Sequence, residues 1–163
     1  MRAIPEPAFG SDDGSASPEV AEALRRVAGG AGLEVAIAAL CDARVLVPVV
    51  ALRGDDAGST EADDGEGTVD MAAVLLTGRD GRRALLAFTD LAALAGWDAH
   101  ARPVPVTTRQ AAQSALAEGA DALVVDVAGP VQVPVEGDAL RRVADGQRLV
   151  PDGDGWAWVR PLR

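Results

Sequence analysis

The stretch from Leu85 to Val143, LLAFTDLAALAGWDAHARPVPVTTRQAAQSALAEGADALVVDVAGPVQVPVEGDALRRV, contains most of the signals that decide the fold. Its first apolar run is typical of a strand and ends at Phe88. Thr89 or Asp90 then predicts the start of a short helix, because either side chain can accept a hydrogen bond from a free amide of the first turn. Gly96 predicts the end of that helix.

The middle of this stretch combines a proline-rich segment with a helix start. Residues 102–106 (RPVPV) are expected to form an extended connector, because two prolines disfavour a helix there. Thr107 and Gln110 have the spacing of a capping box, in which each side chain bonds the backbone amide of the other residue. The helix that they open should end at Gly119, and its apolar side consists of Ala111, Ala112, Ala115 and Leu116.

The last part of the stretch predicts two strands and a helix. Residues 122–127 and 131–135 are short apolar runs joined around Gly129 and Pro130, which favour a turn. Asp138 is expected to cap the following helix, which should end at Gly146. The expected buried side of this helix consists of Leu140, Val143 and Ala144.

Two helices are predicted near the beginning of the chain. Ser17 is a suitable N-cap, Pro18 suits the first helical position, and Gly29–Gly30 should end the helix. A second helix is expected over residues 33–42, because its apolar residues recur with a helical period. A strand is the alternative for this segment, because β-branched residues alternate with alanines in it.

The segment between these helices and Leu85 predicts a strand, a loop and a hairpin. Residues 45–52 are almost all apolar and contain Pro48, so we expect a strand that is buried on both faces or bent at a sheet edge. Residues 54–67 are acidic and lack large apolar side chains, which predicts a mobile loop. Residues 69–77 and 82–88 should pair as a hairpin around an Asp-Gly turn.

The chain ends in a second predicted hairpin. Leu149 and Val150 precede a turn over residues 151–155, and residues 156–159 form the returning strand. In that strand Trp156 and Trp158 should share one face, because side chains alternate along a strand.

The order of these elements predicts an α+β fold. Hairpins cluster with helices between them, and strict strand–helix–strand repetition is absent, so we expect a mixed or antiparallel sheet with helices packed on it. We expect a flexible tail over residues 1–16 and one domain over residues 17–163, a length that suits a single hydrophobic core.

Composition limits the classes of partner. The chain of 163 residues has a formal net charge of −10, which disfavours nucleic acid and anionic membranes as partners. No run approaches the ~20 apolar residues that a membrane-spanning helix needs. The first residues lack the charged and apolar pattern of a signal peptide, and the single cysteine allows no internal disulfide, so we expect a cytoplasmic protein.

The sequence shows no assembled catalytic or metal-binding motif. His100 is the only histidine, and we interpret it as a surface residue rather than as a general base held by Asp98. Cys41 lies on the apolar side of a predicted helix and is interpreted as unreactive. Neither the acidic loop nor Asp152–Gly155 has the spacing of a calcium loop. We therefore expect no catalytic residues, no metal and no cofactor.

Several motifs in a fixed order resemble those of the SseB (enhanced-serine-sensitivity) family N-terminal domain, in its high-GC bacterial branch. The resemblance covers about residues 20–145. The motifs are residues 39–49 (ALCDARVLVPV), 85–90 (LLAFTD), Trp97, 103–106 (PVPV) and 119–125 (GADALVV).

The resemblance implies a compact α+β domain, with one departure from the family pattern. Where the family commonly has Asn-Pro after the 119–125 motif, this chain has Asp126 and Val127. Some descriptions of the family mention type III secretion. This sequence argues against that role, because it lacks long coiled-coil heptads and a membrane-inserting segment.

Two functions are consistent with the sequence. The first is a non-catalytic module that binds an unidentified protein partner, or a second copy of itself, through Trp97, Trp156 and Trp158. The alternative is a small-molecule sensor or weak enzyme with a pocket near Phe88, Trp97, His100 and Asp126.

Overall fold

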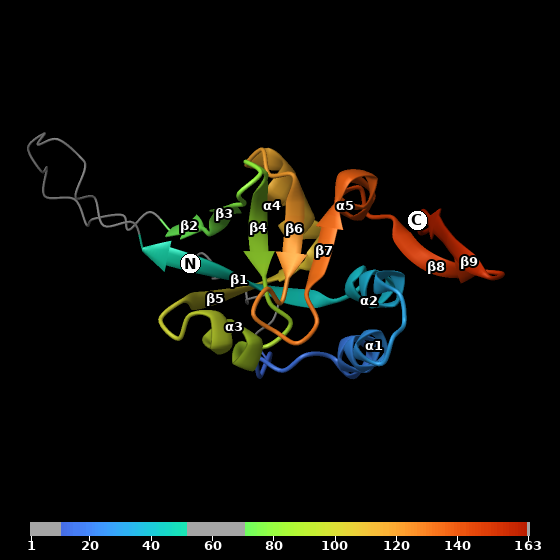
Figure 1. Cartoon of the computed structure of the whole chain (residues 1–163), viewed down its shortest axis with the longest axis horizontal. Helices are drawn as coiled ribbons and strands as arrows, with labels where there is room; N and C mark the ends of the chain where they lie inside the picture. The colour runs from blue at the N-terminus through green and yellow to red at the C-terminus, as the bar shows by residue number, and fades with distance from the viewer. Residues whose placement is uncertain (1–10, 52–70, 163) are drawn as a thin grey trace, which may run out of the picture.

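The computed structural model describes residues 11–51 and 71–162, which form helices and three sheets (Figure 1). The helices are α1 (Pro18–Ala28), α2 (Leu33–Leu40), α3 (Leu91–Trp97), α4 (Thr108–Ala117) and α5 (Gly137–Ala144). The strands are β1 (Arg44–Ala51), β2 (Met71–Ala73), β3 (Leu75–Thr77), β4 (Arg83–Ala87), β5 (Arg102–Thr107), β6 (Ala122–Val125), β7 (Val133–Glu136), β8 (Arg148–Asp152) and β9 (Gly155–Val159).

A four-stranded sheet in the order β3-β4-β6-β7 forms the centre of the fold. β4 and β6 are parallel, and the two outer pairs are antiparallel. One face of this sheet packs against α1, α2, α4 and α5, and α4 lies behind the sheet in Figure 1. The main core lies on this face and includes Leu85, Leu123, Val125, Val133 and Val135.

A three-stranded sheet in the order β2-β1-β5 joins the central sheet through one antiparallel bridge between Leu46 and Phe88. The Leu46 amide donates to the Phe88 carbonyl at 2.7 Å, and the Phe88 amide donates back at 2.8 Å. A second, smaller core surrounds this joint, and Leu46, Leu86, Phe88 and Leu94 are its buried members.

The prediction that residues 102–106 form only a connector is wrong, because β5 pairs with β1 along its whole length. Pro105 lies opposite Leu46, and Pro103 lies opposite Pro48. The backbone groups of Leu46 bond to Phe88, on the side away from β5, so these are the non-hydrogen-bonded pairs of the ladder. The prolines therefore lose no ladder bond, and their nitrogens point to the open edge.

The expected strand over residues 69–77 is divided between two sheets. The part at 71–73 pairs with β1, whereas residues 75–77 pair with β4. The 78–81 turn therefore closes the predicted hairpin, but only β3 belongs to that hairpin. The predicted acidic loop, residues 54–67, falls within residues 52–70, which are outside the described residues.

Most predicted helix starts are confirmed. Ser17 caps α1, Asp90 caps α3, and Thr107 and Gln110 form the capping box of α4. Asp138 was expected to cap α5, but the N-cap is Glu136, so that prediction is wrong. Gly137 has a left-handed φ of +58°, which glycine adopts without a steric penalty and which allows α5 to follow β7 directly.

The structure confirms the α+β fold class, and the segment that could be a helix or a strand is a helix, α2.

Replacing Phe88 tests the joint between the sheets. Phe88 is fully buried, so Phe88→Ala should lower the free energy of unfolding by about 3–5 kcal/mol through lost burial and a cavity. Urea denaturation measures this change. Leu116→Ala, on the exposed side of α4, is the control and should change stability by less than about 1 kcal/mol. Equal losses in the two variants would contradict the assignment of Phe88 to the core.

Candidate interaction site

The C-terminal hairpin presents a continuous tryptophan face. In the β8–β9 pair Leu149 lies opposite Trp158, and Pro151 lies opposite Trp156. Directly opposite residues share one face of an antiparallel pair, so these four side chains form one surface. The expectation that Trp156 and Trp158 share a face is confirmed. We call these four residues the tryptophan face.

The base of the hairpin is held on the domain by burial and charge. Leu149 is buried, and the half-buried Trp158 packs against the main core. Arg148 pairs with Asp42, just beyond the end of α2. Arg160 pairs with Asp145, just beyond the end of α5, at 2.6 Å. The inner half of the tryptophan face is therefore fixed against the domain.

The outer half of the hairpin extends from the domain (Figure 1). Trp156 is 37% exposed. Two exposed aspartates precede it, Asp152 at the end of β8 and Asp154 in the turn. A two-stranded hairpin on its own is marginally stable in water, because it buries little apolar area. The outer half therefore offers apolar surface that a partner could cover.

Trp97, the third predicted contact residue, lies elsewhere. It ends α3 and is half-buried, and its ring centroid is 5.6 Å from that of Phe88. In Figure 1, α3 and the β8–β9 hairpin lie on opposite sides of the molecule. The structure brings Trp156 and Trp158 together and separates Trp97 from them.

Asp126 occupies the carboxyl end of β6, beside the end of the parallel strand β4. It is buried, and its φ of +58° is unusual for a residue other than glycine. Its carboxylate accepts hydrogen bonds from the Thr89 amide at 2.8 Å and from the Thr89 hydroxyl at 2.7 Å. Burial raises the pKa of the Asp126 carboxyl, although the bonds from Thr89 act in the opposite direction.

A pocket of about 440 Å³ lies beside Asp126. Its wall is mostly apolar, and its charged groups are two carboxylates. The lining residues are Ala16, Ala21, Leu24, Thr89, Asp90, Ala92, Ala93, Asp126, Gly129 and Pro130.

The four residues of the predicted small-molecule pocket do not converge. Phe88 is fully buried in the smaller core beside Trp97, and neither residue lines the pocket at Asp126. His100 lies beyond the end of α3 and is exposed. The Asp98 carboxylate accepts a hydrogen bond from the backbone amide of His100 at 2.8 Å, which is a local turn contact.

Sequence reasoning missed the contacts of residues 12–15, which it placed in the flexible tail. Asp12 pairs with Arg44 at 2.5 Å, and Arg44 also donates to the Ser15 carbonyl at 2.5 Å and to the Thr89 carbonyl at 2.9 Å. Gly14 has a left-handed φ, and its carbonyl accepts from the Leu91 amide at 2.8 Å. No sequence spacing links Asp12 to Arg44, because the pair depends on the tertiary fold.

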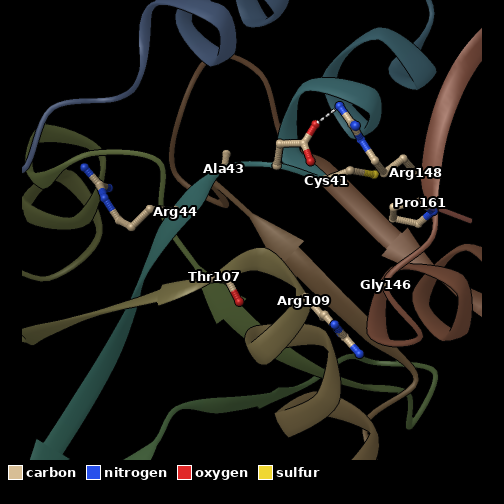
Figure 2. Close-up of a pocket in the computed structure, with 9 residues that line it drawn as sticks. Cys41, Ala43, Arg44, Thr107, Arg109, Gly146, Arg148 and Pro161 are labelled. Atoms are coloured by element: carbon tan, nitrogen blue, oxygen red, sulfur yellow. Dashed lines mark hydrogen bonds and ion pairs between the residues drawn. The ribbon is translucent and has the colours of Figure 1, made fainter. Parts of the chain in front are cut away.

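A second pocket, of about 280 Å³, lies near the base of the hairpin (Figure 2). Arg148 pairs with Asp42, whereas Arg44 and Arg109 point in different directions in Figure 2, so the arginines do not converge on one anion. Burial raises the pKa of the Cys41 thiol, which lowers the fraction of reactive thiolate. The lining residues are Cys41, Asp42, Ala43, Arg44, Thr107, Arg109, Gly146, Arg148 and Pro161.

A third pocket, of about 290 Å³, lies on the face of the central sheet opposite α4. We call it the sheet-face groove. Sequence reasoning did not identify it, because it depends on which residues are neighbours across four strands. Its apolar lining consists of Leu76, Ala84, Leu86, Ala122, Val124, Val127 and Pro134.

In residues 11–51 and 71–162, no group of three or more His, Cys, Asp or Glu side chains is arranged to hold a metal ion. Within the same ranges, no helix has the length and apolar character required to cross a bilayer.

These features define a small α+β domain with an exposed aromatic hairpin. The family model described as SseB protein N-terminal domain matches residues 20–142, so the chain belongs to the SseB family. The match ends before the hairpin at residues 148–159. Comparisons with curated proteins and with solved structures gave no match.

The buried carboxyl of Asp126 predicts a pH dependence of stability. Its folded-state pKa is raised above the ordinary value of 3.8, so its contribution is fully present below that pH and is lost as the pH rises through the folded pKa. Asp126→Asn should remove this contribution. Urea denaturation between pH 3.5 and pH 7, values chosen around the ordinary pKa of about 4, measures it. Wild type should lose stability relative to the variant as pH rises. A free energy of unfolding of wild type that rises with pH relative to that of Asp126→Asn would contradict a raised pKa for Asp126.

Proposed function

We propose that this SseB-family protein is a non-catalytic interaction module that binds a protein partner through the tryptophan face of the β8–β9 hairpin. One observation carries the proposal: the face begins in the main core at Trp158 and continues past the domain to Trp156, which is 37% exposed. We propose that the protein and its partner are both cytoplasmic.

The energetics of protein interfaces support this use of the hairpin. Tryptophan combines a large apolar surface with few rotatable bonds, and it is enriched among the side chains that dominate binding. The buried Leu149 and the ion pair between Arg148 and Asp42 hold the base of the hairpin before binding. A contact surface that is already fixed loses less conformational entropy when a partner binds, so binding is more favourable.

The positions of the reactive side chains support a role without catalysis. His100 is exposed beyond α3, Cys41 has a raised thiol pKa, and the Asp126 carboxylate is bonded to Thr89. A catalytic site needs a nucleophile, a base and a polarising group within reach of one another. These three residues lie in three different environments.

A substitution pair tests the proposal. Trp156→Ala removes the exposed end of the tryptophan face, whereas Val159→Ser alters a residue of similar exposure, 40%, on the opposite face of the hairpin. Tagged wild-type protein should capture a partner from cell lysate in near-equimolar amount, measured by quantitative mass spectrometry. Trp156→Ala should weaken the complex by at least about 2 kcal/mol, roughly thirtyfold.

Val159→Ser should capture the same partner as wild type. Thermal melting of both variants checks that the fold is retained. Equal recovery of the partner by wild type and Trp156→Ala would contradict the proposal. Capture of nothing by wild type would contradict it as well.

The pocket beside Asp126 favours a second candidate function, the binding of a small molecule. The pocket lies at the carboxyl ends of the parallel strands β4 and β6, a common place for ligands in sheets with parallel strands. Because Asp90 and Asp126 are its charged groups, we propose that it takes a small cation with a short apolar part.

A panel of short alkylamines, with the matching alcohols and acids as controls, tests this second candidate. The amines should raise the melting temperature of wild type but not of Asp126→Asn. Asp98→Asn, a carboxylate outside the pocket, should respond as wild type does. An equal response of wild type and Asp126→Asn would exclude the pocket as the binding site.

A further inference from the structure

Of the two strands of the C-terminal hairpin, β9 has the open edge. β8 contacts α2, and its Pro151 has no amide hydrogen to offer an added strand. β9 contains no proline, and within the described residues it pairs only with β8. The edge strands β2 and β3 also lack proline, but each has three residues, whereas β9 has five. β9 is therefore the edge best suited to the addition of a further strand.

The turn of the hairpin determines which backbone groups of β9 face this open edge. Asp152 and Gly155 pair across a tight turn, so they exchange hydrogen bonds, and the pairs of the ladder alternate from there. Trp156 and Trp158 then fall in the non-hydrogen-bonded pairs, which agrees with the position of a proline opposite Trp156. The N–H and C=O groups of Trp156 and Trp158 therefore point away from β8, to the open edge.

A second β9 strand that runs antiparallel fits this edge. When Trp156 lies opposite Trp158 of the second copy, symmetry also places Trp158 opposite Trp156 of that copy. Each of these pairs can exchange two hydrogen bonds, because the backbone groups of all its members face the shared edge. We propose that this protein forms a two-fold dimer by pairing β9 with β9 in this register. The inference goes beyond the proposed function, because it concerns the backbone edge of β9 rather than the tryptophan face.

The same register places matching side chains opposite one another. Directly opposite residues share a face, so the exposed Trp156 lies beside the half-buried Trp158 of the second copy, and aromatic pairs of this kind stabilise a sheet. On the other face Ala157 lies opposite Ala157 of the second copy, and Val159 lies opposite its Gly155. β9 contains no charged residue. The second copy therefore covers apolar surface that the hairpin alone leaves open.

The charges beside β9 differ at its two ends. Asp152 and Asp154 precede the strand and Arg160 follows it, so the antiparallel register brings the aspartates of one copy towards Arg160 of the other. Arg160 already pairs with Asp145 at 2.6 Å and its side chain is 71% exposed, so this attraction is small. The net charge of −10 on each copy opposes association. Backbone pairing and the tryptophan contacts carry a weak, reversible dimer.

Pairing through β9 closes the assembly at two copies. The combined sheet has the strand order β8-β9-β9-β8, so both of its outer strands are β8. Each outer strand contains Pro151 and contacts α2 of its own domain. The contact is isologous, since both copies use the same surface, and it leaves no equivalent edge for a third copy.

Cysteine cross-linking tests the register. Ala157→Cys, in a Cys41→Ala background, places two thiols directly opposite each other at the two-fold axis, at a separation that a disulfide can span. Oxidation of the purified full chain should convert most of it to a covalent dimer that a reductant separates, as measured by non-reducing gel electrophoresis. Val159→Cys in the same background is the matched control on the same face. Its thiols are offset by roughly 13 Å along the strands and should not link.

Opposite charges at the two-fold axis provide a second test. Ala157→Lys and Ala157→Glu each place two like charges opposite each other, so each should weaken self-association at least about fivefold, as measured by sedimentation over a range of concentrations. An equimolar mixture of the two variants should form a heterodimer that is tighter than either homodimer. Val159→Lys and Val159→Glu lie off the axis, so their mixture should show no such preference. Thermal melting confirms that each variant is folded.

The contrary outcomes overturn the inference. A wild type that stays monomeric at every concentration would do so, as would equal cross-linking of Ala157→Cys and Val159→Cys, or a mixture of Ala157→Lys and Ala157→Glu without preference. Ala157→Lys retains the tryptophan face, so its capture of a partner from lysate tests the proposed function separately. If it captures the partner while wild type does not dimerise, the proposed function stands and this inference fails. If wild type neither dimerises nor captures a partner, both are wrong.

Discussion

The structure depends on the pair of hydrogen bonds between Leu46 and Phe88. These two bonds are the bridge between the three-stranded sheet and the central sheet, and both side chains are buried at the joint. The residue after Phe88 is Thr89, which binds the Asp126 carboxylate and, through its carbonyl, Arg44. The joint therefore also sets the position of the contacts at the carboxyl ends of β4 and β6.

Local signals predicted the elements that depend on neighbouring residues. Asp90 and the Thr107–Gln110 pair identified helix starts, because capping involves residues only three positions apart. Pairing across the fold was harder to predict. Prolines at 103 and 105 are compatible with a strand only when the register directs their nitrogens to an open edge, and a single sequence does not contain that register.

The same division applies to the candidate sites. Alternation along a strand was enough to place Trp156 and Trp158 on one face. The sheet-face groove could not be predicted, because the hollow arises from Ala84 and Ala122 lying side by side although they are far apart in the chain. The position of Trp97 beside Phe88 likewise depends on how α3 returns to the joint between the sheets.

The prolines of the outer strands have a further consequence, for solubility. Pro103 and Pro105 lie in β5, Pro134 in β7 and Pro151 in β8, and each of these strands lies at an edge of its sheet. An unprotected edge strand can pair with the edge of another molecule and start aggregation. Proline has no amide hydrogen to donate, so each one interrupts the ladder that an incoming strand would need. The domain can thus expose aromatic surface while its edges resist uncontrolled strand addition.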